Sequence, residues 1–274
     1  MLFELVGAAV LLGAAATFFA GPSGQAAPSG APPAGGASGD PGAGSPPLAR
    51  FVWWHGLIAL GLFFGLQVAG GICWYVIAFV TKRDFMSVVP LLIVTAICDA
   101  VLVLAICTAA VFMYRGRVRD LGLGLAMPRS GLQWLWVPLG TGAMFLFGIG
   151  YDQLLQLFGY QMEQELMAPL RVMTGVLPWI IVMQTAGLAI PVAEEIVFRS
   201  CVYSGFKSSL GTFWGVVLSA LAFTLVHGDL DASPPLFLMG VITALAFERT
   251  RSLYVPILIH ALNNIVTLTI LGAT

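Results

Sequence analysis

Eight long apolar runs constrain the fold of this chain more than any other feature. A helix that crosses a lipid bilayer needs about 20 mostly apolar residues. The runs cover residues 2–20, 51–80, 86–114, 132–158, 178–207, 213–228, 234–248 and 253–272. Apolar residues make up 59% of the chain and charged residues only 9%, whereas about a quarter of an ordinary soluble domain is charged. The sequence therefore predicts an all-α, polytopic transmembrane bundle of about eight spans.

Residues 21–47 differ in composition from the rest of the chain. Gly, Pro, Ala and Ser fill 25 of these 27 positions, so we expect a flexible linker that buries no core. We divide the chain into an N-terminal apolar anchor (1–20), the linker (21–50), N-terminal transmembrane helices (51–175) and a C-terminal region (176–274). A retained anchor is favoured over a cleaved signal peptide, because no Lys or Arg precedes the first apolar run.

The basic residues of the loops predict the orientation of the bundle, because cytoplasmic loops carry an excess of Lys and Arg. With eight spans, one side receives eight basic residues and the other side receives three. The larger set is Arg50, Arg115, Arg117, Arg119, Arg129, Lys207, Arg249 and Arg251. We expect an integral, multi-pass protein of the plasma (inner) membrane, in contact with lipid, with this set in the cytoplasm. The net charge of -1 offers no basic surface for a nucleic acid partner.

Charged residues inside the spans are expected to be functional, because each is costly to place in a bilayer. Glu194, Glu195 and Arg199 lie within six residues of one predicted span. Glu195 and Arg199 are spaced i and i+4 with the acid first, the favourable order for a helical ion pair, whereas Glu194 points about 100° away. The motif therefore predicts one neutralised acid and one free acid. Pro191, just upstream, lacks an N–H group and should kink this helix.

Two later spans carry further polar residues at helical spacing. Phe223 and His227 are one turn apart near the end of the sixth run, and His260 and Asn264 are one turn apart in the last. At about 1.5 Å per residue, Glu194, His227 and Asn264 lie roughly 20 Å from the cytoplasmic ends of their helices, and His260 roughly 14 Å. We therefore expect these side chains to converge on one active site in an intramembrane cavity.

These residues form three ordered motifs that resemble the CPBP family, which includes type II CAAX prenyl endopeptidases and bacteriocin-processing or immunity (Abi) membrane proteins. The motifs are Glu-Glu-x-x-x-Arg, Phe-x-x-x-His and His-x-x-x-Asn, and the resemblance covers about residues 176–270. It implies an intramembrane endopeptidase in which Glu194 is the general base that activates water and His227 positions that water. It also implies that His260 and Asn264 stabilise the oxyanion. The supporting residues would be Glu195, Arg199 and Phe223.

A zinc site is the alternative to this metal-free mechanism. Glu194, His227 and His260 are side chains of the types that bind zinc, and three such ligands would leave an open position for water. The HExxH sequence typical of many zinc peptidases is absent from the chain, and a glutamate bound to zinc is not free to act as the base. We therefore expect no cofactor.

Two other functions stay open at the level of the sequence. One is a non-proteolytic immunity or scaffold protein that binds a peptide or partner in the same cavity. The other is a transporter, although the internal repeat of many transporters is not visible. For the endopeptidase, we expect a peptide or protein substrate, with a lipidated tail or a leader peptide as candidate classes. Asp99 matches no motif; a structural hydrogen bond to a neighbouring helix is favoured there over a proton path.

Overall fold

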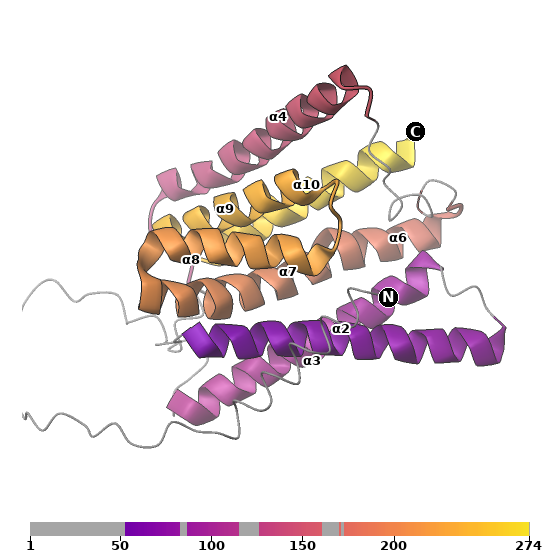
Figure 1. Cartoon of the computed structure of the whole chain (residues 1–274), viewed down its shortest axis with the longest axis horizontal. Helices are drawn as coiled ribbons and strands as arrows, with labels where there is room; N and C mark the ends of the chain where they lie inside the picture. The colour runs from indigo at the N-terminus through magenta and orange to yellow at the C-terminus, as the bar shows by residue number, and fades with distance from the viewer. Residues whose placement is uncertain (1–52, 83–86, 115–125, 161–169, 171–172, 274) are drawn as a thin grey trace, which may run out of the picture. The chain divides into compact units, whose positions relative to one another are not determined.

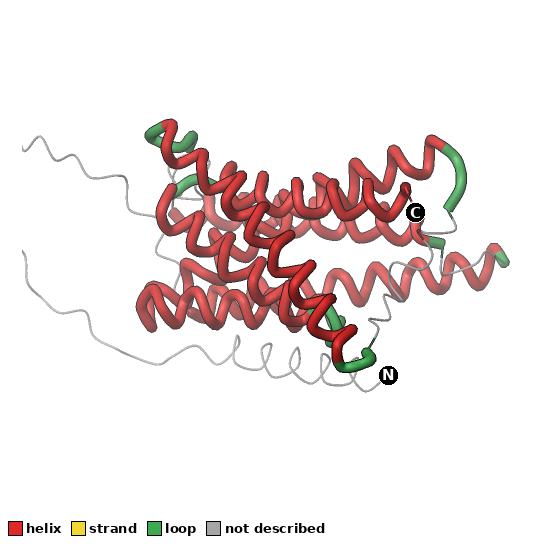
Figure 2. Tube along the Cα trace, turned by 90° about the horizontal axis from the view of Figure 1, so that it is seen from above, coloured by secondary structure: helices red, strands yellow, loops and turns green. Residues whose placement is uncertain are grey.

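The computed structural model describes residues 53–82, 87–114, 126–160, 170 and 173–273. The expected anchor (1–20) and linker (21–50) lie outside this part of the chain. Within it, all regular secondary structure is helical, as the colours of Figure 2 show. The predicted all-α class is therefore confirmed for the described residues.

Figure 1 shows the helices of the described chain. In chain order they are α2 (Trp53–Thr81), α3 (Val88–Tyr114), the 3-10 helix η2 (Gly131–Leu135), α4 (Trp136–Leu157), α6 (Val176–Gln184), the π-helix η3 (Thr185–Ala189), α7 (Ile190–Glu195), the π-helix η4 (Ile196–Tyr203), α8 (Ser204–His227), α9 (Ser233–Thr250) and α10 (Tyr254–Ala273). The helix from α6 into α8 is thus continuous and contains two π-helical segments. Pro191 sits in the α-helical segment between the two π-helices, so the distortion expected at this proline takes the form of wider turns.

A break at Gly211 divides α8 into two helical pieces. Gly211 has φ 82° and ψ 172°, which are not helical values, and a positive φ is strained for residues that carry a Cβ atom. Beyond this break α8 packs against η4, so the chain folds back on itself. This reversal separates the predicted runs 178–207 and 213–228, as the sequence indicated.

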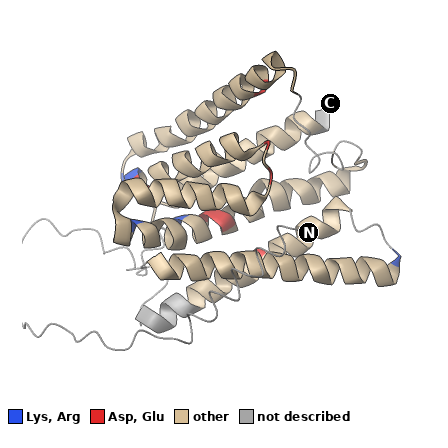
Figure 3. Ribbon diagram, in the orientation of Figure 1, with Lys and Arg blue, Asp and Glu red and all other residues tan. Residues whose placement is uncertain are grey.

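Five stretches of the described chain are long and apolar enough to cross a membrane. They are Trp53–Thr81, Val88–Thr108, Gly131–Leu157, Val176–His227 and Tyr254–Leu271. The fourth contains the break at Gly211, and α9 is not among the five, so the predicted number of about eight spans is not confirmed. Lys, Arg, Asp and Glu occupy little of the helical surface in Figure 3, as expected of helices surrounded by lipid.

Helices α7 and η4 are packed on several sides by other helices. Helix α3 lies against η3 and α7, α2 and α8 lie against η4, and α10 lies against η3 and α7. The main apolar cluster includes Phe198 of η4 and Phe223 of α8, both fully buried, together with residues from α2, α3, α4, α9 and α10. The glutamate motif is therefore held on helices that are surrounded by the rest of the bundle.

Several basic residues that were predicted to share one side of the membrane lie at the same end of the bundle. Lys207 Nζ donates to both carboxylate oxygens of Glu248 at 2.6 Å, and Arg251 Nη2 donates to Glu248 Oε1 at 3.0 Å. The side chain of Gln133 donates to the carbonyl oxygen of Arg249 at 3.2 Å. These contacts join the ends of α8, α9 and η2.

The close contact between α8 and α9 at Gly240 can be tested by substitution. A Cβ atom at Gly240 would lie 2.7 Å from the Cα atom of Ala220, so the two helices would have to separate. We expect Gly240→Ala to lower the free energy of unfolding by about 1–3 kcal/mol, measured by thermal unfolding in detergent micelles. Gly142→Ala in α4 is the matched control, since a Cβ atom there meets no atom within 4 Å. Equal stability of the two variants would contradict this packing.

Candidate active site

Glu195 and Arg199 form a fully buried ion pair. Arg199 Nε donates to Glu195 Oε2 at 2.7 Å, and both side chains are 0% exposed. The pairing is the one that the i and i+4 spacing predicted. Because an unpaired charge in an apolar interior is very costly, the pair removes most of the electrostatic penalty of this motif.

The remaining hydrogen-bonding capacity of the pair is used by three other helices. Arg199 Nη1 donates to Ser219 Oγ of α8 at 3.2 Å and to the carbonyl oxygen of Gly240 of α9 at 3.0 Å. His260 of α10 places Nδ1 3.1 Å from Glu195 Oε1. A buried ion pair is tolerated when its other donors and acceptors are also satisfied, and here that requirement brings α8, α9 and α10 to one point.

Glu194 lies beside the two predicted histidines. His227 Nε2 is 4.0 Å from Glu194 Oε1, and His260 Nε2 is 3.7 Å from Glu194 Oε2. The side chains of Glu194 and His227 are 9% and 27% exposed. The structure thus brings together one carboxylate and two imidazoles from three helical segments that are far apart in the sequence.

The Nδ1 contacts of the two histidines decide what their Nε2 atoms can do. His227 Nδ1 lies 2.7 Å from the carbonyl oxygen of Phe223, and a carbonyl oxygen only accepts hydrogen bonds. His260 Nδ1 faces the Glu195 carboxylate, which is paired with Arg199 and also accepts. We therefore assign the proton to Nδ1 in both rings, so that in the neutral rings both Nε2 atoms are acceptors that face Glu194.

Phe223 supports both imidazoles through ring contacts. Its ring centroid lies 4.6 Å from that of His227 and 5.6 Å from that of His260. It also packs edge-on against Phe198 at 5.1 Å. The fully buried aromatic ring thus fixes the separation of the two histidines and gives a physical reason for a phenylalanine one turn before His227.

Asn264 of α10 contacts the backbone of η3, the π-helix that directly precedes α7 and its glutamate motif. In a π-helix the carbonyl of residue i accepts from the N–H of residue i+5, and Ile190 donates to the Thr185 carbonyl in this way. The next bond of the series would join the Ala186 carbonyl to Pro191, which has no N–H. Asn264 Nδ2 donates to this carbonyl at 2.9 Å, so the side chain replaces the backbone donor that the proline lacks.

Comparison with known proteins gives this geometry a family context. Residues 175–266 match the family model described as type II CAAX prenyl endopeptidase Rce1-like. The chain contains an Rce1-like domain. This stretch includes all of the candidate residues named above.

Two curated relatives of the chain are named as bacterial membrane proteins. The chain is 32% identical over 136 residues to "Putative membrane peptidase YdiL" of Bacillus subtilis (strain 168). This alignment covers 49% of this chain and 54% of the relative. It is 36% identical over 80 residues to "Membrane-embedded CAAX protease MroQ" of Staphylococcus aureus (strain USA300). That alignment covers 27% of this chain and 32% of the MroQ protein. The aligned parts are thus about half or less of each relative. No solved structure matches the chain.

Some polar contacts of the described chain could not be found from the three motifs. Ser219 and Gly240 are small residues in apolar runs, and nothing in their spacing marks them as partners of Arg199. The link between His260 and Glu195 was also missed, because the spacing assigned Glu195 to Arg199 alone. Gln67 of α2, which donates to Asp99 Oδ1 at 2.5 Å, could have been noticed as an amide inside an apolar span.

The metal alternative has the right donor types but lacks a matching placement. Glu194, His227 and His260 supply a carboxylate and two imidazoles, and hydrogen bonds at Nδ1 are common for metal-binding histidines. However, in the described part of the chain no group of three or more His, Cys, Asp or Glu side chains is placed so that it could hold a metal ion. We therefore derive no step of the chemistry through a metal.

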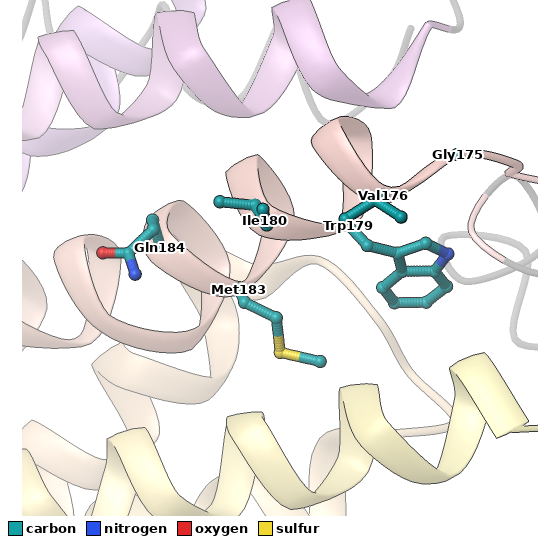
Figure 4. Close-up of a pocket in the computed structure, with 6 residues that line it drawn as sticks. All are labelled: Gly175, Val176, Trp179, Ile180, Met183 and Gln184. Atoms are coloured by element: carbon teal, nitrogen blue, oxygen red, sulfur yellow. The ribbon is translucent and has the colours of Figure 1, made fainter.

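A separate pocket lies beside α6, near the start of the helix that carries Glu194. Its volume is about 540 Å³, and its lining residues are Gly175, Val176, Trp179, Ile180, Met183 and Gln184. In Figure 4, Trp179 and Met183 extend from α6 toward α10. None of the candidate active-site residues lines this pocket, so it is distinct from the group around Glu194.

The contact between Asn264 and η3 predicts a specific coupling with Pro191. We expect Asn264→Ala to leave the Ala186 carbonyl without this donor and to lower the free energy of unfolding by about 1–3 kcal/mol. In a Pro191→Ala background the backbone regains its N–H group, so the same substitution should cost clearly less. A double-mutant cycle measured by thermal unfolding in detergent tests this coupling.

Asn263→Ala is the matched control for this cycle, because it removes the neighbouring amide from the same helix. Its effect on stability should be the same with Pro191 and with Ala at that position. A cost of Asn264→Ala that does not depend on residue 191 would contradict the assignment.

Proposed function

We propose that this protein is an intramembrane endopeptidase in which Glu194 activates a water molecule to hydrolyse a peptide bond. The observation that carries the proposal is the contrast between two adjacent glutamates. Glu195 is neutralised by Arg199 and bonded to His260, whereas no Lys or Arg of the described chain pairs with Glu194, which faces two imidazoles at 4.0 and 3.7 Å. A free carboxylate in an apolar setting is suited to act as a general base.

The distances around Glu194 support a bridging water. Separations of 3.7–4.0 Å are too long for direct hydrogen bonds, and polar groups at such distances are commonly bridged by water. The Glu194 oxygens and both Nε2 atoms act as acceptors when the rings are neutral, and water can donate to two acceptors at once. In the proposed mechanism Glu194 and His227 hold this water, and Glu194 takes its proton as the water attacks the peptide carbonyl carbon.

The tetrahedral intermediate needs hydrogen-bond donors aimed at its oxyanion. We assign this role to the second N–H of the Asn264 amide, with the His260 ring, one turn before it on α10, beside the oxyanion. The first N–H of Asn264 is already donated to the Ala186 carbonyl, which fixes the orientation of the amide. Collapse of the intermediate would return the proton from Glu194 to the leaving amine, so that no further acid is needed.

The substrate class and the cellular setting are part of the same proposal. The family description and the name of the MroQ relative both refer to CAAX substrates, so a lipidated tail is one candidate class and a leader peptide is the other. We place the protein in the plasma membrane with its basic loops in the cytoplasm. The grouping of Lys207, Arg249 and Arg251 at one end of the bundle supports this orientation.

Glu194→Gln tests the proposed base directly. The amide keeps the volume of the side chain but cannot accept a proton from water, so we expect the cleavage rate to fall about 10²- to 10⁴-fold. Purified wild type and variant would be incubated in micelles with a peptide library, and products would be read by mass spectrometry. Thermal unfolding of both proteins controls for misfolding. Equal cleavage by the folded variant would contradict the proposal, as would an inactive wild type whose cellular function survives the substitution.

Removal of metal tests the proposed catalytic type. Because the mechanism uses only side chains and water, we expect exhaustively chelated protein to keep its full cleavage rate, with metal content checked by elemental analysis. Loss of activity on chelation, followed by recovery with one equivalent of zinc per chain, would assign the reaction to a metallopeptidase instead.

A further inference from the structure

A second buried carboxyl group lies in the bundle outside the three motifs. Asp99 of α3 is 2% exposed, and Gln67 Nε2 of α2 donates to its Oδ1 at 2.5 Å. The expected structural hydrogen bond to a neighbouring helix is therefore present. However, it satisfies only one of the two carboxyl oxygens, and ionisable groups inside membrane spans usually have a function.

The packing of α3 determines where along the length of the bundle the Asp99 carboxyl group lies. At one end, Leu92 of α3 and Ala186 of η3 pack against the same apolar cluster. Further along, Leu102 of α3 and Val197 of η4 belong to another shared cluster. Residue numbers rise together along both helices, so α3 runs parallel to the helix that carries the glutamate motif.

Asp99 and Glu194 occupy equivalent positions in this register. Asp99 is three residues before Leu102, and Glu194 is three residues before Val197. Helix α3 packs directly against α7, the segment that carries Glu194. The two carboxyl groups therefore lie at the same depth, on facing helices.

The surroundings of Asp99 favour a carboxyl group that keeps its proton. Its Oδ2 is buried and has no hydrogen-bond partner among the described residues. Of the charged groups on the helices packed against α3, Glu194 of α7 would repel an Asp99 carboxylate, and Glu195 of α7 is already paired with Arg199. A carboxylate with one neutral donor and a like charge nearby is strongly disfavoured.

We propose that Asp99 is a positioning residue for Glu194: a proton-bearing carboxyl group, held by Gln67, whose O–H donates a hydrogen bond to the water that Glu194 binds. The proton stays on Asp99 throughout the reaction, so the group adds a donor to the site without adding a negative charge. This inference rests on the proposed function, because it assigns a role in orienting the base of that reaction.

The first experiment compares Asp99→Asn with Asp99→Leu. Asparagine keeps a donor, an acceptor and the neutral charge, so we expect kcat to stay within about threefold of wild type. Leucine has a similar volume but no donor, so kcat should fall about 10- to 100-fold with KM unchanged. If Asp99→Asn is as impaired as Asp99→Leu, or if Asp99→Leu is as active as wild type, the proposal is overturned.

Asp152 offers a matched control on another helix. Gln156 Nε2 donates to Asp152 Oδ2 at 2.7 Å, a pair of the same two residue types on α4, which packs against α9 and α10. Asp152→Asn and Asp152→Leu should both leave kcat unchanged. Glu194→Gln should lower the cleavage rate about 10²- to 10⁴-fold with or without the Asp99 substitutions, so cleavage by Glu194→Gln at the wild-type rate signals failure of the proposed function and not of the role of Asp99.

Infrared spectroscopy gives a readout that does not depend on activity. The difference spectrum of wild type minus Asp99→Asn should contain the C=O stretching band of a protonated carboxylic acid, and the band should persist in Glu194→Gln. Carboxylate bands in its place would overturn the proposal. This measurement also decides the question if Asp99→Leu does not fold, because neither protein that it compares lacks a polar side chain at position 99.

Discussion

The buried ion pair of Glu195 and Arg199 is the interaction on which the arrangement of the C-terminal helices depends. Burying two charges costs more than their mutual attraction returns unless the geometry is good and the remaining donors and acceptors are satisfied. Here Arg199 donates to α8 and α9, and Glu195 contacts His260 of α10. The close approach of Gly240 to Ala220 brings the Gly240 carbonyl within reach of Arg199. The hydrogen-bonding requirements of this one ion pair therefore constrain three helices at once.

A backbone carbonyl group of η3 that needs a hydrogen-bond donor adds a second constraint on α10. In lipid a carbonyl without a partner has no water to bond, and helices with proline are tolerated where a neighbouring helix supplies a donor. Asn264 supplies it for the Ala186 carbonyl, one turn along α10 from His260. Since both residues are bonded to the same continuous helix, α10 is fixed in rotation and in register against it. The orientation of the His260 ring toward Glu194 follows from structural requirements that exist before any substrate binds.

Sequence patterns predicted those parts of the molecule that depend on local spacing. Apolar runs gave the helices of the described chain, and the i and i+4 spacing gave the pairing of Glu195 with Arg199. Helical rise gave the meeting of Glu194 with His227 and His260. The π-helices, the partner of the Ala186 carbonyl and the pairing of Gln67 with Asp99 were not predicted, because they depend on how separate helices meet. The predicted number of about eight spans was also not confirmed, because α9 is not among the five described stretches that are long and apolar enough to cross a membrane.

The two adjacent glutamates show how neighbouring residues of one type acquire different chemistry. Glu195 is fully buried, and both of its oxygens are occupied by Arg199 and His260, so a proton could be accepted there only by giving up an ion pair. Glu194 lies one residue earlier and therefore about 100° round the helix, where it meets acceptor nitrogens at distances that leave space for a small donor. The ion pair of Glu195 and Arg199 holds the helices in place, whereas the unpaired Glu194 faces the position that a reacting water would occupy. The two glutamates therefore differ in role because their side chains leave the helix in different directions.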